Sequence, residues 1–240
     1  MLVGLDGSPA ADVALEQAVM LGERFHSTIL VVHAGDGREG AILVERAAER
    51  VRAAGLGVEI TEAPAPALAA LAELAPTVDA VLVGRRGGAG GDAAIGPTVG
   101  GLVRLGEPCV IVCAGAVSPM RSCAVAFDGG DTSRRALELA LQFASVMGST
   151  IHVVHAATER EAGVLVVGVA EAALSMRRVP FVTHIELDAP EVAVARVVKR
   201  APCDAVFAGA HRRRDGRPSG GVSHVGAILH HVDVLVAIEP

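Results

Sequence analysis

Short apolar runs alternate with amphipathic stretches along the whole chain. Leu2–Leu5 reads as a buried strand that ends at an Asp-Gly turn. Ser8 is then predicted to cap a helix that has Pro9 at its first position. The apolar residues of this helix repeat at helical spacing and define one face, which comprises Ala14, Ala18, Leu21 and Phe25. A strand followed by an amphipathic helix is the first unit of the pattern.

The same alternation predicts the other elements. In the first half, strands are expected at Thr28–His33, Val58–Thr61, Ala80–Val83 and Val110–Cys113, and helices at Ala41–Ala54, Leu68–Leu74 and Val99–Leu105. In the second half, strands are expected near Ala124–Phe127, Ile151–His155, Phe181–Glu186, Ala205–Ala208 and Val234–Ile238. Apolar, β-branched runs separated by helices are typical of parallel strands that are covered on both faces.

The two halves of the chain repeat each other. TILVVHA at Thr28–Ala34 recurs as TIHVVHA at Thr150–Ala156, and DAVLVG at Asp79–Gly84 recurs as DAVFAG at Asp204–Gly209. Matches in one order over such long segments indicate a tandem duplication of a whole domain. The predicted fold class is therefore α/β, with two tandem doubly wound, five-stranded parallel-sheet (Rossmann-like) domains. Their expected bounds are 1–116 and 121–240, with a joint near Ala114–Arg121.

Composition and charge narrow the functional classes. A net charge of −6 and only 2% aromatic residues argue against nucleic-acid partners, which need a basic surface or stacking rings. The apolar runs are far shorter than the roughly 20 residues of a membrane span, and Asp6 interrupts the first of them, so we expect no membrane partner and a cytoplasmic protein. The four cysteines lack C-x-x-C spacing and are predicted to be buried free thiols.

The residues that follow the strands are the candidates for ligand contact, because open parallel sheets bind ligands at the carboxyl ends of their strands. Asp6 follows the first strand, His33-Ala34 ends the second, and Gly84 ends the fourth. A glycine-rich segment then runs to Gly91, and Thr98 opens a helix. Glycine-rich loops and helix N-termini suit phosphate groups, and Asp6 is placed to accept hydrogen bonds from a ribose or a base.

Generic catalytic motifs fit poorly. Gly88-x-Gly90-x-x-Ala93 follows the fourth strand, whereas a dinucleotide fingerprint follows the first. A Walker A motif is absent from the sequence, whose single lysine is Lys199, and so is a G-x-S-x-G elbow. Along a helix, His224 and His231 are too far apart to share a metal ion.

Four segments together resemble the universal stress protein family in tandem form: Val3–Ser8, Val31–Ala34, Val83–Gly91 and Glu107–Val112. ATP-binding members carry G-x-x-G, nine residues, then G-S/T. Gly84 and Gly87 fit the first part, whereas Pro97-Thr98 stands at the second, so a proline that lacks an N–H replaces a glycine.

The resemblance implies ATP or a related adenine nucleotide, with Mg²⁺ only as the nucleotide's counter-ion and no metal site of the protein itself. In copy one it implies nucleotide contacts from Gly4, Asp6, Ala34, Gly84, Arg85, Gly87, Gly88, Thr98 and Val99. In copy two it implies contacts from Asp128, Ala156, Gly209 and Gly221. It also implies pairing of the last strands in a pseudo-dimer within the chain, and homodimers are the usual closed assembly.

Copy two departs from the pattern. Ala126 stands where Gly4 stood, and Arg212 replaces the second glycine of G-x-x-G. The loop His211–Arg217 contains four arginines, which either contact phosphate or form a solvated surface. Copy two is therefore either a degenerate nucleotide site or a structural half.

Several residues have a structural interpretation beside the functional one. Asp6 and Asp128 are equally suited to capping turns. His33 and His155 are predicted to be hydrogen-bonded residues at strand ends, not catalytic bases.

The sequence leaves three hypotheses. The first is a regulatory stress-response protein that binds ATP and hydrolyses it weakly at most, since no P-loop lysine, carboxylate pair or positioned base is evident. The second is a nucleotide-free dimerising scaffold with degenerate loops. The third is an enzyme of a related adenine-nucleotide fold, such as a ligase or nucleotidyl transferase.

Overall fold

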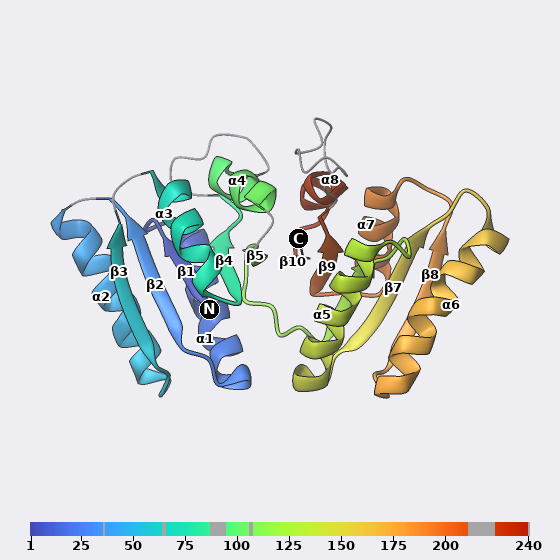
Figure 1. The fold of residues 1–240 in the computed structure, drawn as a ribbon, viewed down its shortest axis with the longest axis horizontal. Helices are drawn as coiled ribbons and strands as arrows, with labels where there is room; N and C mark the ends of the chain where they lie inside the picture. Colours follow the sequence, from blue (N-terminus) through green and yellow to red (C-terminus); the bar gives the residue numbers. More distant parts are fainter. Residues whose placement is uncertain (36, 64–65, 87–94, 106–107, 211–223, 240) are drawn as a thin grey trace. The chain divides into compact units, whose positions relative to one another are not determined.

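The computed structural model describes residues 1–240 except 36, 64–65, 87–94, 106–107, 211–223 and 240. The chain forms two compact units, Met1–Val117 and Ser118–Pro240. Each unit consists of a parallel sheet with helices on both faces (Figure 1).

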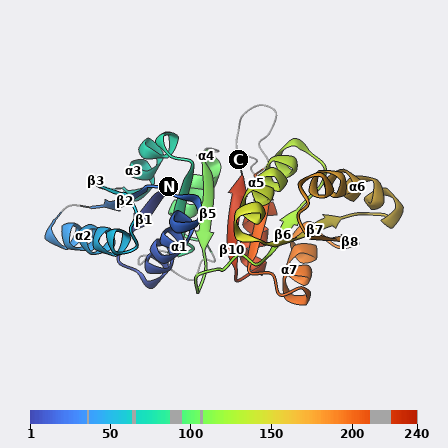
Figure 2. The same ribbon diagram turned by 90° about the horizontal axis from the view of Figure 1, so that it is seen from below.

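Unit 1 is a doubly wound sheet with the strand order β3-β2-β1-β4-β5, in which all neighbouring strands are parallel. Its strands are β1 (Leu2–Leu5), β2 (Ile29–Ala34), β3 (Val58–Ala63), β4 (Ala80–Gly84) and β5 (Cys109–Cys113). Its helices are α1 (Pro9–Phe25), α2 (Arg38–Ala53), α3 (Ala67–Leu74), the 3₁₀ turn η1 (Ala75–Thr77) and α4 (Pro97–Leu105). Helices α1 and α2 cover one face, and α3 and α4 lie on the other (Figure 2).

Unit 2 repeats this topology with the strand order β10-β9-β6-β7-β8. Its strands are β6 (Ser122–Ala126), β7 (Thr150–Ala156), β8 (Phe181–Glu186), β9 (Ala205–Gly209) and β10 (Leu235–Glu239). Its helices are α5 (Asp131–Met147), α6 (Arg160–Arg177), α7 (Pro190–Arg200) and α8 (His224–His231). The predicted fold class, two tandem doubly wound parallel sheets, is confirmed.

The first helix forms as the sequence predicts. The Ser8 hydroxyl accepts a hydrogen bond from the Ala11 N–H at 3.2 Å, and Pro9 occupies the first turn. Of the predicted apolar face, Ala14, Ala18 and Leu21 are fully inaccessible, whereas Phe25 at the end of the helix is half-buried. Burial of this face against β1 and β4 provides most of the stability of such a helix.

Two elements begin earlier in the chain than predicted. Helix α2 begins at Arg38 instead of Ala41, because Arg38 and Glu39 are charged and exposed and so carry no hydrophobic period. Strand β6 begins at Ser122, whose backbone pairs with Thr150 although its side chain is hydrophilic. Polar residues at the ends of elements account for both differences.

All four cysteines are free and buried, as predicted. Burial raises the pKa of Cys113 and of Cys123 to about 12 in each case, so these thiols are protonated at neutral pH. Among the helices that the structure describes, none is long and apolar enough to cross a bilayer.

Candidate functional site

A crevice of about 470 Å³ opens at the carboxyl ends of β1, β2 and β4 in unit 1. Six of the predicted site residues of copy one line it: Gly4, Asp6, Ala34, Gly84, Thr98 and Val99. Gly87 and Gly88 lie outside the described residues. The strand order reverses between β1 and β4, so the crevice lies at the switch point where open α/β sheets bind ligands.

One wall of the crevice is apolar. It is lined by Val32 and Ala34 of β2 and by Ala67 and Leu71 of α3. Gly4 keeps this wall open, because a Cβ at that position would come within 3.2 Å of the Leu71 side chain. An apolar wall of this kind suits a flat ring that has little charge.

Asp6 stands at the mouth of the crevice and also shapes the turn behind β1. Its Oδ1 accepts a hydrogen bond from the Ser8 N–H at 3.0 Å, and Gly7 between them has a φ of +75°. Asp128 makes the same bond in unit 2, to the Gly130 N–H at 2.8 Å. Both carboxylates therefore cap turns, as the structural interpretation proposed, and both also line a crevice.

The opposite end of the crevice is positively polarised. Gly96 donates its N–H to the Arg85 carbonyl at 3.0 Å, which brings the two ends of the glycine-rich segment together. As a result Arg86 and the N-terminus of α4 line the same end of the crevice. Unpaired N–H groups and the helix dipole make such an end attractive to anions.

Pro97 is compatible with this arrangement. It is the first residue of α4, a position where proline is favoured because the missing N–H has no intrahelical acceptor in any case. The two following residues, Thr98 and Val99, line the crevice. The proline removes one donor but leaves the first helical turn intact.

Arg85, which was predicted to contact the nucleotide, is not among the residues lining the crevice. Its backbone instead extends the sheet, because its N–H donates to the Cys113 carbonyl at 3.0 Å. Arg86, which sequence reasoning did not select, is the arginine that lines the crevice. Two adjacent arginines after a strand carry no signal as to which one points inward.

Gly84 at the end of β4 is required by packing, whether or not a ligand binds. A Cβ on Gly84 would lie 2.7 Å from the backbone carbonyl carbon of Ala10 in α1. A Cβ on Gly209, at the end of β9, would lie 2.5 Å from the corresponding backbone atom of Thr132 in α5. Both glycines let a helix approach a strand closely, so their presence alone does not identify a ligand site.

His33 and His155 are hydrogen-bonded at strand ends, as predicted. Nδ1 of His33 lies 2.9 Å from the Leu5 carbonyl, and Nδ1 of His155 lies 2.8 Å from the Phe127 carbonyl. A carbonyl only accepts, so Nδ1 carries the proton in both rings. Each histidine thus ties the second strand of its unit to the end of the first.

The equivalent crevice of unit 2 has a volume of only about 130 Å³. Asp128, Ala156 and Gly209, which were predicted as nucleotide contacts, line it, whereas Gly221 and the arginine-rich loop 211–217 lie outside the described residues. Ala126 adds a methyl group where Gly4 leaves space. His224 lines the region that Thr98 lines in unit 1, and its Nδ1 lies 3.4 Å from a carboxylate oxygen of Glu191.

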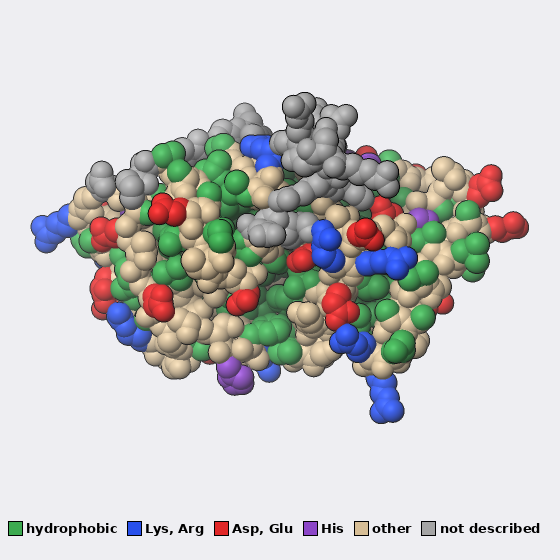
Figure 3. Space-filling model, viewed as in Figure 1, with side chains coloured by type: hydrophobic (Ala, Val, Ile, Leu, Met, Phe, Trp, Pro, Cys, Tyr) green, Lys and Arg blue, Asp and Glu red, His purple; other side chains and the backbone are tan. Residues whose placement is uncertain are grey.

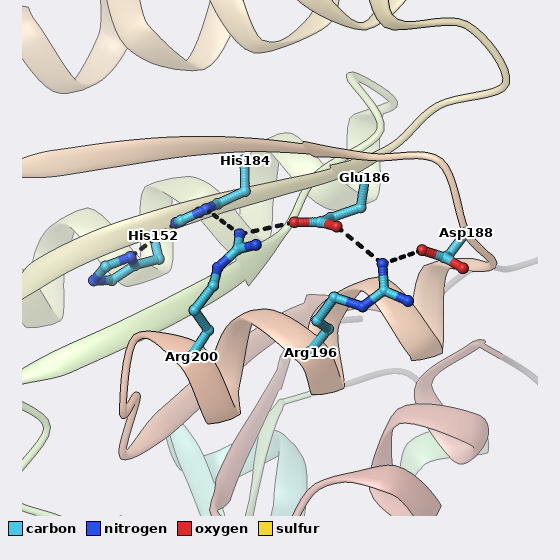
Figure 4. A network of polar contacts seen from close by, with 6 residues as sticks. All are labelled: His152, His184, Glu186, Asp188, Arg196 and Arg200. Atoms are coloured by element: carbon cyan, nitrogen blue, oxygen red, sulfur yellow. Dashed lines mark hydrogen bonds and ion pairs between the residues drawn. The ribbon is translucent and has the colours of Figure 1, made fainter.

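A polar network that sequence reasoning missed joins β7, β8 and α7 of unit 2 (Figure 4). Nδ1 of His152 lies 3.0 Å from Nε2 of His184, and the Arg200 guanidinium lies 3.0 Å from the other nitrogen of His184. Arg200 also pairs with Glu186 at 2.8 Å, and Arg196 bridges Glu186 and Asp188. Burial lowers the pKa of both histidines, and for His184 the nearby Arg200 adds to the effect.

Charged side chains of both signs are interspersed on the face in Figure 3. Within the described ranges, no group of three or more His, Cys, Asp or Glu side chains is placed to hold a metal ion.

The fold and the crevice place the chain in the class of doubly wound α/β proteins with a crevice at the topological switch point. Residues 1–112 match the family model described as the Universal stress protein family. Residues 1–112 therefore form a domain of the universal stress protein family, and unit 2 repeats the topology of this domain.

Solved structures support the tandem fold. A universal stress protein from Archaeoglobus fulgidus is similar with a TM-score of 0.81 and 17% identity, over 99% of this chain and 97% of that one. A functionally unknown protein from Pseudomonas aeruginosa gives a TM-score of 0.78 and 16% identity, over 99% and 90%. The cytoplasmic domain of a prokaryotic cation chloride cotransporter gives 0.63 and 8%, over 99% and 93%. No curated protein matches the chain.

Proposed function

We propose that this chain is a regulatory stress-response protein that binds one adenine nucleotide, ATP, in the crevice of unit 1. The match of residues 1–112 to the universal stress protein family supports the stress-response role. The difference in volume between the two crevices, about 470 Å³ against about 130 Å³, is the observation that carries the assignment to unit 1. Ligand pockets usually span about 300–1,000 Å³, so the crevice of unit 1 falls within this range and the described crevice of unit 2 falls below it.

The chemistry of the unit 1 crevice fits the parts of a nucleotide. The apolar wall around Leu71 and Ala34 suits the adenine ring, and the Asp6 carboxylate at the mouth suits a ribose hydroxyl. Arg86 and the first turn of α4 suit the phosphates. Mg²⁺ would then arrive with the nucleotide.

The titratable side chains that line the crevice support a regulatory role with weak hydrolysis at most. A phosphoryl-transfer site needs a base or a positioned water, together with cations that follow the developing charge. Near this crevice the described titratable side chains are Asp6, His33 and Arg86. Asp6 and His33 are already engaged in hydrogen bonds to the backbone, so we do not expect either to act as the base. Bound ATP would then act as a signal of cellular state.

The nucleotide-free scaffold is the second candidate function. The packing of Gly84 against Ala10 favours it, because the glycine that opens the family motif would be needed even without a ligand. Under this alternative neither unit binds ATP, and the duplicated fold serves only for association.

The experiment is calorimetric titration of ATP into the full chain and into two matched variants. Asp6→Ala and Asp128→Ala each remove one carboxylate that caps the same turn in its own unit. We expect Asp6→Ala to weaken ATP binding at least about tenfold, because a hydrogen bond to a charged group is lost. Asp128→Ala is expected to leave the affinity unchanged.

Two results would overturn the proposal. An equal loss in both variants would indicate that the effect arises from the turns and not from a contact in unit 1. Absence of heat at millimolar ATP in the unmodified chain would leave the scaffold function standing.

A further inference from the structure

Helix α6 has two apolar faces, of which only one is buried. Its inner face packs on β7 and β8 and includes Gly163, Val167, Ala170 and Leu174. Its outer face is also apolar, with Leu165 79% exposed, Val169 43% and Met176 84%. Figures 1 and 2 show α6 on the outside of the sheet of unit 2, next to β8. A second apolar face on a surface helix is unusual and points to a partner.

The outer face repeats with the spacing of a coiled-coil seam. Alternating steps of three and four residues separate its members, which we call the α6 seam: Ala162, Leu165, Val169, Ala172 and Met176. All five are exposed. This spacing is the one with which two helices interlock along their length.

The fold itself does not require the α6 seam. Helix α2 is the counterpart of α6 in unit 1, and its buried residues Gly40, Val44, Ala47 and Val51 fall at the same places as those of α6. The positions of α2 that match the seam hold Glu39, Ile42, Arg46, Glu49 and Ala53. The outer face of α2 is thus largely charged although the two helices pack on their sheets in the same way.

The seam is self-complementary about Val169. A two-fold axis through this residue in an antiparallel pair would place Leu165 opposite Ala172 and Ala162 opposite Met176, so that large residues meet small ones. A parallel pair would place Leu165 opposite Leu165 and Ala172 opposite Ala172. Contacts in which the same patch faces itself are the usual basis of closed dimers.

Charges at the ends of α6 also favour the antiparallel pair. Glu161 lies in the first turn, and Arg177 and Arg178 lie at the end of the helix. Arg177 already pairs with Glu138 at 2.8 Å, whereas Arg178 is exposed. An antiparallel pair places the first turn of one α6, with Arg160 and Glu161 after Glu159, beside the last turn of the other, with Arg177 and Arg178. A net negative end then meets a positive end, whereas a parallel pair aligns like ends.

We infer that the α6 seam is the contact through which two copies of this chain associate, as an antiparallel α6–α6 pair around a two-fold axis at Val169. Eighteen helical residues span about 27 Å, so the contact is small and the dimer is weak. This inference does not depend on nucleotide binding.

The test is sedimentation equilibrium of the full chain with one matched pair of variants, from roughly 1 µM to roughly 500 µM protein. Leu165→Arg places a charge in the seam, and Ile42→Arg makes the same type of change at the matching position of α2. We expect reversible dimerisation of the unmodified chain, at least about tenfold weaker association of Leu165→Arg, and unchanged association of Ile42→Arg. A strictly monomeric chain, or equal effects of the two variants, would overturn the inference.

Disulfide trapping tests the direction of the helices and does not depend on Leu165→Arg being well folded. Ala162→Cys and Met176→Cys proteins are mixed and oxidised with copper–phenanthroline, and the four native cysteines are buried. The antiparallel pair predicts a cross-link that forms in the mixture and not in either protein alone. Cross-linking within each single protein, or none in the mixture, would contradict the arrangement.

Discussion

At the scale of single residues, the chain uses glycine for two different purposes in one short region. Gly4 opens space against Leu71 in the crevice, whereas Gly84 lets α1 approach β4. The first role keeps the crevice open, and the second lets a helix pack closely on a strand. A sequence motif reports only that both residues are glycine, so the structure is needed to separate the two roles.

The packing role predicts a loss of stability. In Gly84→Ala, the new Cβ would lie 2.7 Å from backbone atoms of Ala10, which cannot rotate away. We expect the free energy of unfolding to fall by about 1–3 kcal/mol, as in other overpacked sites. Urea unfolding followed by circular dichroism measures the change.

Gly168→Ala is the control for this experiment. Gly168 lies within α6, and no atom would meet an added Cβ there. Alanine is expected to stabilise the helix by up to about 1 kcal/mol. A Gly84→Ala protein as stable as the parent would show that α1 does not approach β4 as described.

At the scale of elements, equivalent strands of the two units carry different residues at the same positions. His152 of β7 and His184 of β8 stack with their ring centroids 5.3 Å apart. The equivalent positions in unit 1 hold Leu30 and Thr61, which do not titrate. Unit 2 therefore has a pH-dependent contact between β7 and β8 that the equivalent positions of unit 1 do not provide.

The histidine pair predicts acid sensitivity. Because the pKa of each ring is lowered from 6.5 in the folded state, the unfolded chain binds protons first as the pH falls. The stabilising contribution is complete above about pH 6.5 and is lost as the pH falls toward the folded-state pKa values. Arg200 beside His184 strengthens this effect, and Glu186 opposes it.

The measurement is urea unfolding at several pH values between 5 and 7.5 for the parent and for His152→Leu, which introduces the residue that unit 1 has. The variant is expected to lose less stability on acidification than the parent. An equal loss in the two proteins would place the acid-sensitive groups elsewhere.

The helices and strands were largely predictable from the sequence, but the side-chain contacts between them were not. Alternating apolar runs and amphipathic stretches identify strands and helices because burial imposes the period on each element. The contact of His152 with His184 depends on the pairing of β7 with β8, and the inward position of Arg86 depends on how the chain leaves β4. Neither is encoded in local periodicity.

At the scale of the whole molecule, the duplicated units share one topology but differ in the volume of their crevices. The sequence repeat and the strand-end positions of Asp6 and Asp128 predicted where each crevice lies. The sequence did not predict that one crevice is far larger than the other, since the volume depends on how α3 and α7 pack over their strands. One local sign of the smaller crevice was present in the sequence: unit 2 has Ala126 at the position where unit 1 has Gly4.

The duplicated fold also allows each surface to be judged against its counterpart. The charged outer face of α2 and the apolar outer face of α6 belong to helices with matching buried positions. One copy therefore acts as the reference for the other, both for the crevice and for the α6 seam.

The central claim is that only unit 1 binds nucleotide. Equilibrium dialysis of the unmodified chain, first stripped of copurified nucleotide by reversible denaturation, against labelled ATP measures the stoichiometry directly. The account predicts saturation at one ATP per chain. Saturation at two would show that the small crevice of unit 2 also accepts nucleotide, and no binding at millimolar ATP would contradict the claim altogether.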